Sequence, residues 1–163
     1  MPKRYLRIEL SHQRLICLEE ARTVALYPVS TARAGAGEER DSGCTPRGWH
    51  RIRLKIGADC PRNMVFVGRR PTGEIYTETL AREKPDRDWI LSRILWLTGS
   101  ELGFNRGGLV DTLRRHIYIH GTPEESLIGV PVSHGCIRMR NQDLMKLFDW
   151  VDNGMPVEIV DQP

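Results

Sequence analysis

The sequence contains no hydrophobic run long enough to cross a bilayer, no internal repeat and no dense basic block. The early apolar segments, such as Tyr5–Leu10 and Leu15–Leu18, are short and interrupted by charge. They provide neither a span of about 18 apolar residues nor the apolar core of a secretory signal. The 24 Lys and Arg residues are scattered among 21 Asp and Glu residues. We therefore expect no membrane insertion, no nucleic acid partner and a cytoplasmic location, or a periplasmic one if a signal has been removed.

Cysteine is sparse, with one residue each at positions 17, 44, 60 and 136, and no C-x-x-C pair occurs. A domain of this size does not need disulfides, so we expect free thiols in a reducing compartment. His120, His134 and Cys136 have the chemistry of zinc ligands, but a fourth ligand and the usual paired spacing are missing. The sequence therefore predicts neither a metal site nor any other cofactor.

The pattern that is present is mostly β. The length of 163 residues suits one domain over 1–163, and we expect a monomer. Apolar and polar residues alternate in several short segments, as in half-buried strands. A polar, Gly-rich stretch over 30–45 predicts a loop. Strands are expected at Tyr5–Leu10, Arg14–Leu18, Thr23–Val29, Trp49–Ile56, Met64–Gly68, Trp89–Leu97, His116–His120 and Pro156–Val160.

Only the C-terminal region has a clear helical period. Leu144, Leu147, Phe148 and Val151 fall at i, i+3, i+4 and i+7, which places them on one apolar stripe. Asn141 is a candidate N-cap, and Asn153-Gly154 is a candidate stop. The predicted fold is a β-sandwich or partly open barrel with this one helix docked on it.

One segment carries residues suited to catalysis. His120 ends a predicted strand in His120-Gly121-Thr122, and Cys136 follows sixteen positions later within Ser133–Met139. A free cysteine has a pKa of about 8.5, and a neighbouring imidazole and backbone N–H groups lower it. Gly135 permits a sharp turn, after which the N–H groups of His134, Gly135 and Cys136 could converge on an oxyanion. We interpret Cys17, Cys44 and Cys60 as buried small hydrophobes, and His12, His50 and His116 as surface or turn residues.

The pattern H-G-T followed by S-H-G-C-I-R-M resembles the YkuD-type L,D-transpeptidase catalytic domain, also called the ErfK/YbiS/YcfS/YnhG group. Thr45–Ile52 is similar to the family segment T-P-x-G-x-F-x-I, with His50 in place of the usual aromatic residue. Asn141-x-Asp143 and Gly154–Val157 match as well. The resemblance extends from about Tyr5 to Val160 and implies the fold of that catalytic domain.

The resemblance also implies roles for individual residues. Cys136 corresponds to the nucleophile, and His120 to the general base and later acid, oriented by the main-chain carbonyl of Gly121. His134 and Gly135 shape the site and its oxyanion hole, and Ser133 supports the loop. Arg138 is similar to the residue that meets a substrate carboxylate, with a salt bridge that holds the loop as its alternative role.

The family reaction cleaves the L,D bond between diaminopimelate and the terminal D-Ala of a peptidoglycan tetrapeptide stem, through a thioester. Water as acceptor gives an L,D-carboxypeptidase of muropeptide recycling, which we expect here. An amine acceptor gives 3-3 crosslinks or D-amino-acid exchange, and a silent peptidoglycan-binding domain is a further alternative. The segment 78–115 is longer than in minimal members of the family, and we expect it to form part of the cleft wall or a lid.

Overall fold

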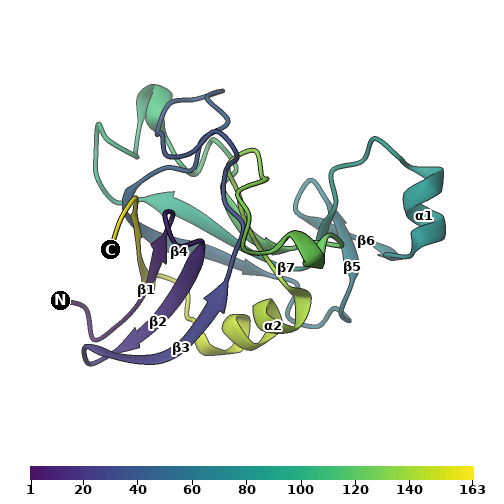
Figure 1. The fold of residues 1–163 in the computed structure, drawn as a ribbon, viewed down its shortest axis with the longest axis horizontal. Helices are drawn as coiled ribbons and strands as arrows, with labels where there is room; N and C mark the ends of the chain where they lie inside the picture. Colours follow the sequence, from purple (N-terminus) through teal and green to yellow (C-terminus); the bar gives the residue numbers. More distant parts are fainter.

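A computed structural model describes residues 1–163, whose strands belong to one strongly bent sheet that is not closed (Figure 1). The sheet order is β3-β2-β1-β10-β4-β7-β5-β6, and β8 branches from β7 to pair with β9. The strands are β1 (Arg4–Glu9), β2 (Arg14–Glu19), β3 (Arg22–Pro28), β4 (Gly48–Ile56), β5 (Met64–Val67), β6 (Arg70–Ile75), β7 (Ile90–Gly99), β8 (Tyr118–Gly121), β9 (Ile137–Met139) and β10 (Pro156–Val160). The helices are α1 (Glu78–Glu83) and α2 (Asn141–Trp150), with short 3-10 turns η1 (Gly108–Val110) and η2 (Glu125–Leu127).

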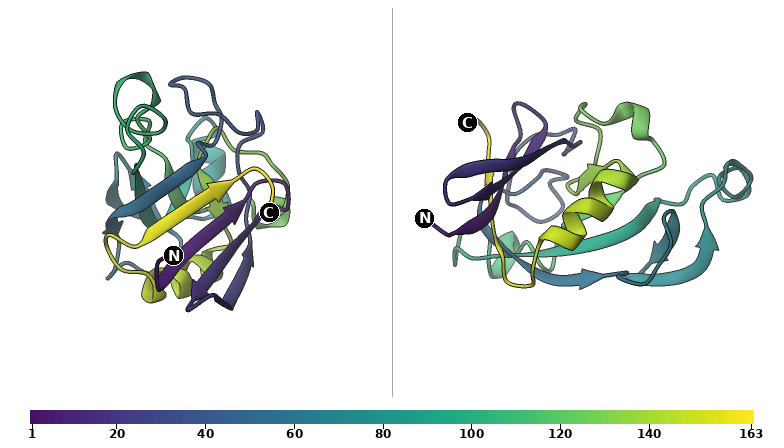
Figure 2. Two further views of the ribbon diagram at one scale, coloured as in Figure 1. Left: turned by 90° about the vertical axis from the view of Figure 1, so that its left-hand side faces the viewer. Right: turned by 90° about the horizontal axis from the view of Figure 1, so that it is seen from below.

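The main hydrophobic core lies between α2 and the sheet that curves around it (Figure 2). All four residues of the predicted apolar stripe contribute to this core, so that prediction is confirmed. They meet alternate residues of β1, β7, β8, β9 and β10, which direct one face of each strand inward. Burial of this stripe against the sheet docks α2 beside β7 and β8.

The mostly-β architecture with a docked C-terminal helix is confirmed. Each expected strand occurs, with small differences at the ends. Strands β6 and β9 and helix α1 were not predicted. β6 contains Pro71 and Gly73, which hide its strand pattern, and it forms an edge hairpin with β5. β9 is only three residues long and lies inside the cysteine motif.

Three expected element ends differ in the structure. Asn141 is the first residue of α2 rather than its N-cap, and its N–H donates to Glu125 Oε2 at 2.7 Å. A carboxylate from a distant segment therefore caps the helix, which ends at Trp150, before Asn153-Gly154. The strand expected from His116 begins only at Tyr118, because His116 has a left-handed backbone with φ 57°.

His50 is a buried core residue, not a surface or turn residue. Its ring nitrogens lie 3.0 Å from Gly48 O and 3.0 Å from Thr112 Oγ1, and burial lowers its pKa to about 4. Of the three cysteines interpreted as buried, only Cys17 is; Cys44 and Cys60 are partly exposed. The substitution of the family's aromatic residue by His50 is therefore accommodated by hydrogen bonds inside the core.

Only part of the segment 78–115 lies near the cysteine motif. Helix α1 projects beyond β5 and β6, far from both termini (Figure 1). Only Asp88 and the residues after Gly107 in this segment line hollows near the cysteine motif. Neither α-helix has the length and apolar character that crossing a bilayer would require.

Candidate active site

The pairing of β8 with β9 brings the two halves of the motif together. The strands are parallel, with Ile119 opposite Ile137 and His120 opposite Arg138. Because side chains alternate along a strand, the isoleucines enter the main core while His120 and Arg138 share the other face. Cys136, two residues before Arg138, lies on that face beside Tyr118.

The ring of His120 is buried and held by its own neighbour. Its Nδ1 lies 2.7 Å from Gly121 O, and the residue is 2% exposed. A carbonyl oxygen only accepts, so Nδ1 carries the proton and Nε2 is left as the acceptor. Burial lowers the pKa of His120, although the Gly121 carbonyl and the Asp88 carboxylate oppose this shift. His120 is therefore a neutral imidazole at neutral pH.

Gly121 is required for packing as well as for its carbonyl. A Cβ there would collide with Asn141 Oδ1 and lie 2.6 Å from Leu91 O. Asn141 in turn donates to Thr122 O at 2.9 Å and accepts from Ser92 Oγ at 2.6 Å. The first residue of α2 thus fixes the H-G-T segment from behind.

Cys136 is a protonated thiol in this structure. Its sulfur donates to His116 O and accepts from Tyr118 N, both at 3.3 Å, and makes no hydrogen bond to His120. Burial raises the pKa of the Cys136 thiol to about 11, outweighing the lowering by the Tyr118 amide and by Arg138. The expectation of a lowered thiol pKa is therefore wrong for the free protein, because enclosure by protein atoms disfavours the charge. The residue still keeps some surface open to the cavity.

The turn before the cysteine is held by two buried hydroxyls. Ser133 Oγ donates to Cys136 O at 2.6 Å and accepts from Gly135 N at 3.2 Å. Thr45 Oγ1 donates to Gly135 O at 2.9 Å and accepts from Ala32 N at 3.0 Å. Gly135 has φ 133°, a conformation that favours glycine.

This arrangement limits the expected oxyanion hole. The Gly135 N–H already donates to Ser133, whereas those of His134 and Cys136 have no protein acceptor. Two of the three predicted donors are therefore free. The side chain of His134 is exposed at the rim of the cavity.

A cavity of about 160 Å³ surrounds the sulfur. Its wall carries both positive and negative side chains, and it is lined by Asp88, Arg115, His116, Ile117, His120, Ser133, His134, Cys136 and Arg138. The Arg138 side chain is 13% exposed, and its Nη1 lies 3.7 Å from Glu124 Oε1. Arg138 therefore faces the cavity while contacting an exposed carboxylate, so both of its expected roles have a structural basis.

Three residues of the site were missed. Thr45 lies in the quoted T-P-R-G segment, but its contact with Gly135 depends on the fold. Asp88 and Arg115 lie in the segment expected to form the wall, and nothing in their local sequence marks them. Arg115 donates to the carbonyl oxygens of Gly37, Glu38 and Cys44, at 3.2, 3.2 and 2.6 Å. No group of three His, Cys, Asp or Glu side chains is arranged to hold a metal ion.

Cysteine-dependent acyl transfer requires a thiol, a neutral imidazole that can accept its proton, and free amide donors for the oxyanion. All three lie together on one face of the sheet here. The chain belongs to the YkuD family of L,D-transpeptidase catalytic domains, enzymes that act on peptidoglycan, and the match covers residues 3–159.

Relatives and solved structures agree with this assignment. ErfK/SrfK of Salmonella typhimurium, named a probable L,D-transpeptidase, is 36% identical over 112 residues, covering 67% of this chain and 35% of that protein. YbiS of Escherichia coli, named likewise, is 49% identical over 45 residues, covering 28% of this chain and 15% of that protein. The chain therefore matches about a third or less of the length of these curated relatives.

The fold is shared with solved L,D-transpeptidases. L,D-transpeptidase 3 of Mycobacterium tuberculosis, in complex with a faropenem-derived adduct, gives a TM-score of 0.59 at 20% identity, covering 99% of this chain and 61% of that one. An Enterococcus faecium L,D-transpeptidase gives 0.60 at 13% identity, covering 98% and 50%. At these identities the likeness concerns the fold alone.

Proposed function

We propose that this chain cleaves the L,D bond between diaminopimelate and the terminal D-Ala of a peptidoglycan tetrapeptide, with water as the final acceptor. The observation that carries the proposal is the shared face of β8 and β9, where Cys136 and a base-form His120 meet in one cavity. Membership of the family supplies the substrate class.

The reaction begins from a neutral pair. Nε2 of His120 takes the thiol proton as the sulfur of Cys136 attacks the diaminopimelate carbonyl carbon, and the N–H groups of His134 and Cys136 receive the oxyanion. Collapse breaks the C–N bond, and His120 returns the proton to the departing D-Ala amine. A water molecule, deprotonated by His120, then attacks the thioester. This step yields the free tripeptide carboxylate and restores the thiol.

The sulfur must turn from His116 O toward His120 before the first proton transfer. A substrate that displaces solvent and supplies a carbonyl carbon at the sulfur would favour that rotation. The raised pKa of Cys136 then has a function, because a neutral thiol in the free enzyme resists oxidation and alkylation.

The charges around the cavity support water as acceptor. Arg138 and Arg115 line the cavity wall with the single carboxylate of Asp88, and Glu124 contacts Arg138 from outside this lining, so guanidinium groups outnumber carboxylates in the wall itself. Guanidinium groups attract the free carboxylate of a terminal D-Ala. They repel an incoming ammonium, which a crosslinking or exchange reaction must bring to the same thioester.

A cytoplasmic site of action is part of this proposal. Its support is that all four cysteines are free, as is usual in a reducing compartment. Fractionation of the native protein tests the location separately from the chemistry.

Mass spectrometry of the products tests the reaction. Purified protein is incubated with disaccharide-tetrapeptide, with and without an added D-amino acid. We expect tripeptide and free D-Ala in both mixtures. Dominant exchange product or 3-3 dimer would replace the carboxypeptidase with a transpeptidase, and no turnover at all would favour a silent binding domain.

A further inference from the structure

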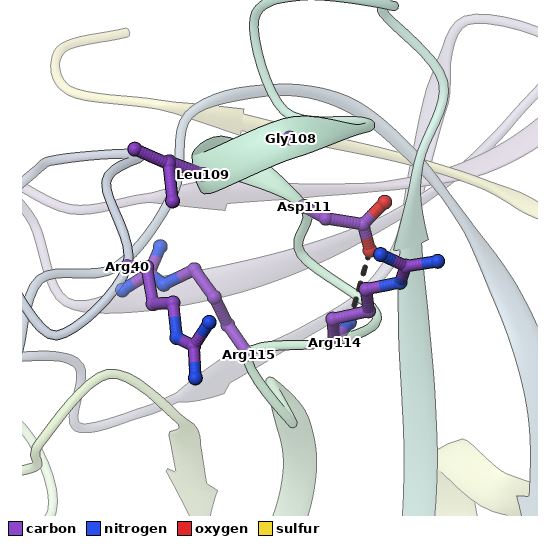
Figure 3. A pocket seen from close by; sticks show the side chains of 6 residues that line it. All are labelled: Arg40, Gly108, Leu109, Asp111, Arg114 and Arg115. Atoms are coloured by element: carbon purple, nitrogen blue, oxygen red, sulfur yellow. Dashed lines mark hydrogen bonds between the residues drawn. The ribbon is translucent and has the colours of Figure 1, made fainter.

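A row of adjoining hollows leads away from the sulfur. The cavity of Cys136 shares Arg115 and His134 with a hollow of about 460 Å³. That hollow shares Arg40 and Arg114 with one of about 210 Å³, shown in Figure 3. Arg114 also lines the last hollow, of about 560 Å³. We call the three outer hollows the arginine groove.

The arginine groove concentrates positive charge. Five arginines with exposed side chains line it: Arg40, Arg51, Arg53, Arg106 and Arg114. Among these five, the only ion pair is the long one between Arg40 and its exposed neighbour Asp41, at 3.8 Å. The whole chain has a net charge of only +3, so this charge is local rather than general. Two carboxylates, Asp41 and Asp111, also line the groove, but the arginines outnumber them. The excess like charges repel one another, and a bound anion removes that cost.

The groove has a firm floor. Arg115 is anchored to backbone carbonyls of residues 37–44, so it holds one wall in place and is not a free anion ligand. Asp111 accepts from Gly107 N at 2.8 Å and from Arg114 N at 2.9 Å. Figure 3 shows Arg40 and Arg115 toward one side of the hollow, with Asp111 and Arg114 toward the other. The outer guanidinium groups therefore stand on a wall that is already ordered.

We propose that the arginine groove binds a diphosphate group carried by the substrate, at the end remote from the scissile bond. The ligand class is a tetrapeptide joined through its sugar to a nucleoside diphosphate. This inference rests on the proposed function and deepens it by naming the preferred form of the substrate.

The number and placement of the arginines favour phosphate over the carboxylates of the peptide. In the proposed reaction, the terminal carboxylate of the tetrapeptide binds near the sulfur, where Arg138 lies, and not in the outer hollows. Arg53 and Arg106 line only the hollow farthest along the row. Arg51 lines it too, but its Nη1 donates to Gly154 O at 2.8 Å, so it is not counted as a free anion ligand. Guanidinium groups bind phosphate oxygens in a bidentate manner, and adjacent phosphates use several of them at once.

Binding is measured first, without catalysis. Calorimetry on Cys136→Ala protein uses two probes, inorganic pyrophosphate and uridine-diphosphate-N-acetylmuramic acid without peptide. We expect saturable binding of both that weakens with added salt. The combined variant Arg53→Gln, Arg106→Gln, Arg114→Gln should weaken it by about tenfold or more.

A matched control carries Arg22→Gln, Arg70→Gln and Arg82→Gln, which are exposed arginines outside the groove with the same change in charge. It should bind both probes as the parent protein does. Melting temperatures of both triple variants identify any loss of folding. Absence of probe binding at low salt, or an equal loss in the control, would overturn the proposal.

Turnover is measured second, with the same tetrapeptide free or attached to the nucleotide sugar. We expect kcat/KM of the wild type to be higher for the attached form, by about tenfold, and this ratio to fall toward one in the groove variant. Equal values in the wild type, or an equal fall for both substrates, would assign the groove to the peptide instead. If no substrate is turned over, the proposed function fails while the binding result still stands.

Discussion

The two ends of the cleft hold their polar groups in opposite ways. At the sulfur, the side chains of His120, Ser133 and Thr45 are buried and hydrogen-bonded to backbone atoms. In the arginine groove, the five guanidinium groups are exposed, and their only ion pair with a carboxylate is the long one between Arg40 and Asp41. Bond breaking requires atoms at fixed positions, whereas attraction of an anion requires only charge near its path.

The two ends of the cleft also differ in charge in the free protein. Burial raises the pKa of Cys136 and lowers that of His120, so the proposed reacting pair is neutral. The groove beside it remains cationic. Variants that change one end should therefore leave the other intact.

The largest effect is expected from Cys136→Ala, which removes the reacting atom. Because the members of such a site act as a unit, D-Ala release should fall by several orders of magnitude, about 10⁴ or more. The melting temperature should change little, since the sulfur bonds only His116 O and Tyr118 N. Substantial release by the variant would exclude Cys136 as nucleophile.

His120→Gln should come next, with a loss of about 10² to 10⁴ in kcat/KM, because the base is removed. The wild-type pH profile provides a second measurement. Burial lowers the pKa of His120, so the base form is complete at neutral pH and is lost only as pH falls below the ordinary histidine value of about 6.5. An acid limb centred above that value would contradict the assignment.

Arg138→Ala separates its two roles. If a largely desolvated guanidinium meets the D-Ala carboxylate, kcat/KM should fall by the equivalent of about 2–5 kcal/mol. In the Arg138→Ala variant, amidation of the tetrapeptide C-terminus should then lower kcat/KM little further. Glu124→Gln is the control, since it removes the ion pair but not the cation. Equal losses in both variants would assign Arg138 to the loop.

Thr45→Val tests how firmly the cysteine turn is held. The change keeps the shape but leaves Ala32 N–H and Gly135 C=O without a partner, which should cost about 1–3 kcal/mol of unfolding free energy. A fall in kcat should accompany it. Thr23→Val, exposed on β3, serves as the matched control in denaturant unfolding.

Asp88→Asn should have the smallest effect. Its carboxylate raises the pKa of both His120 and Cys136, so its removal should lower both. The acid limb of the pH profile and the onset of Cys136 alkylation should both move to lower pH. A shift of either toward higher pH would show that Asp88 acts in another way.

The contrast also explains what could be predicted from the sequence. Eight of the strands and α2 follow from local periodicity, whereas β6 and β9 do not show it. The candidate catalytic residues His120 and Cys136 lie in two contiguous motifs, and the pairing of β8 with β9 brings these motifs together. The arginine groove draws its side chains from separate segments, such as Arg40, Arg53 and Arg114, and no local pattern links them. The raised pKa of Cys136 and the burial of His50 arise from tertiary enclosure, which periodicity does not describe.

Rapid-quench mass spectrometry tests whether Cys136 carries the acyl group during turnover. Enzyme and tetrapeptide are mixed, stopped in acid at successive times, and digested to locate any adduct. We expect a transient tripeptide acyl group on the peptide that contains Cys136, which decays as free tripeptide accumulates. Turnover without this adduct, or an adduct on Cys17, Cys44 or Cys60, would contradict this expectation.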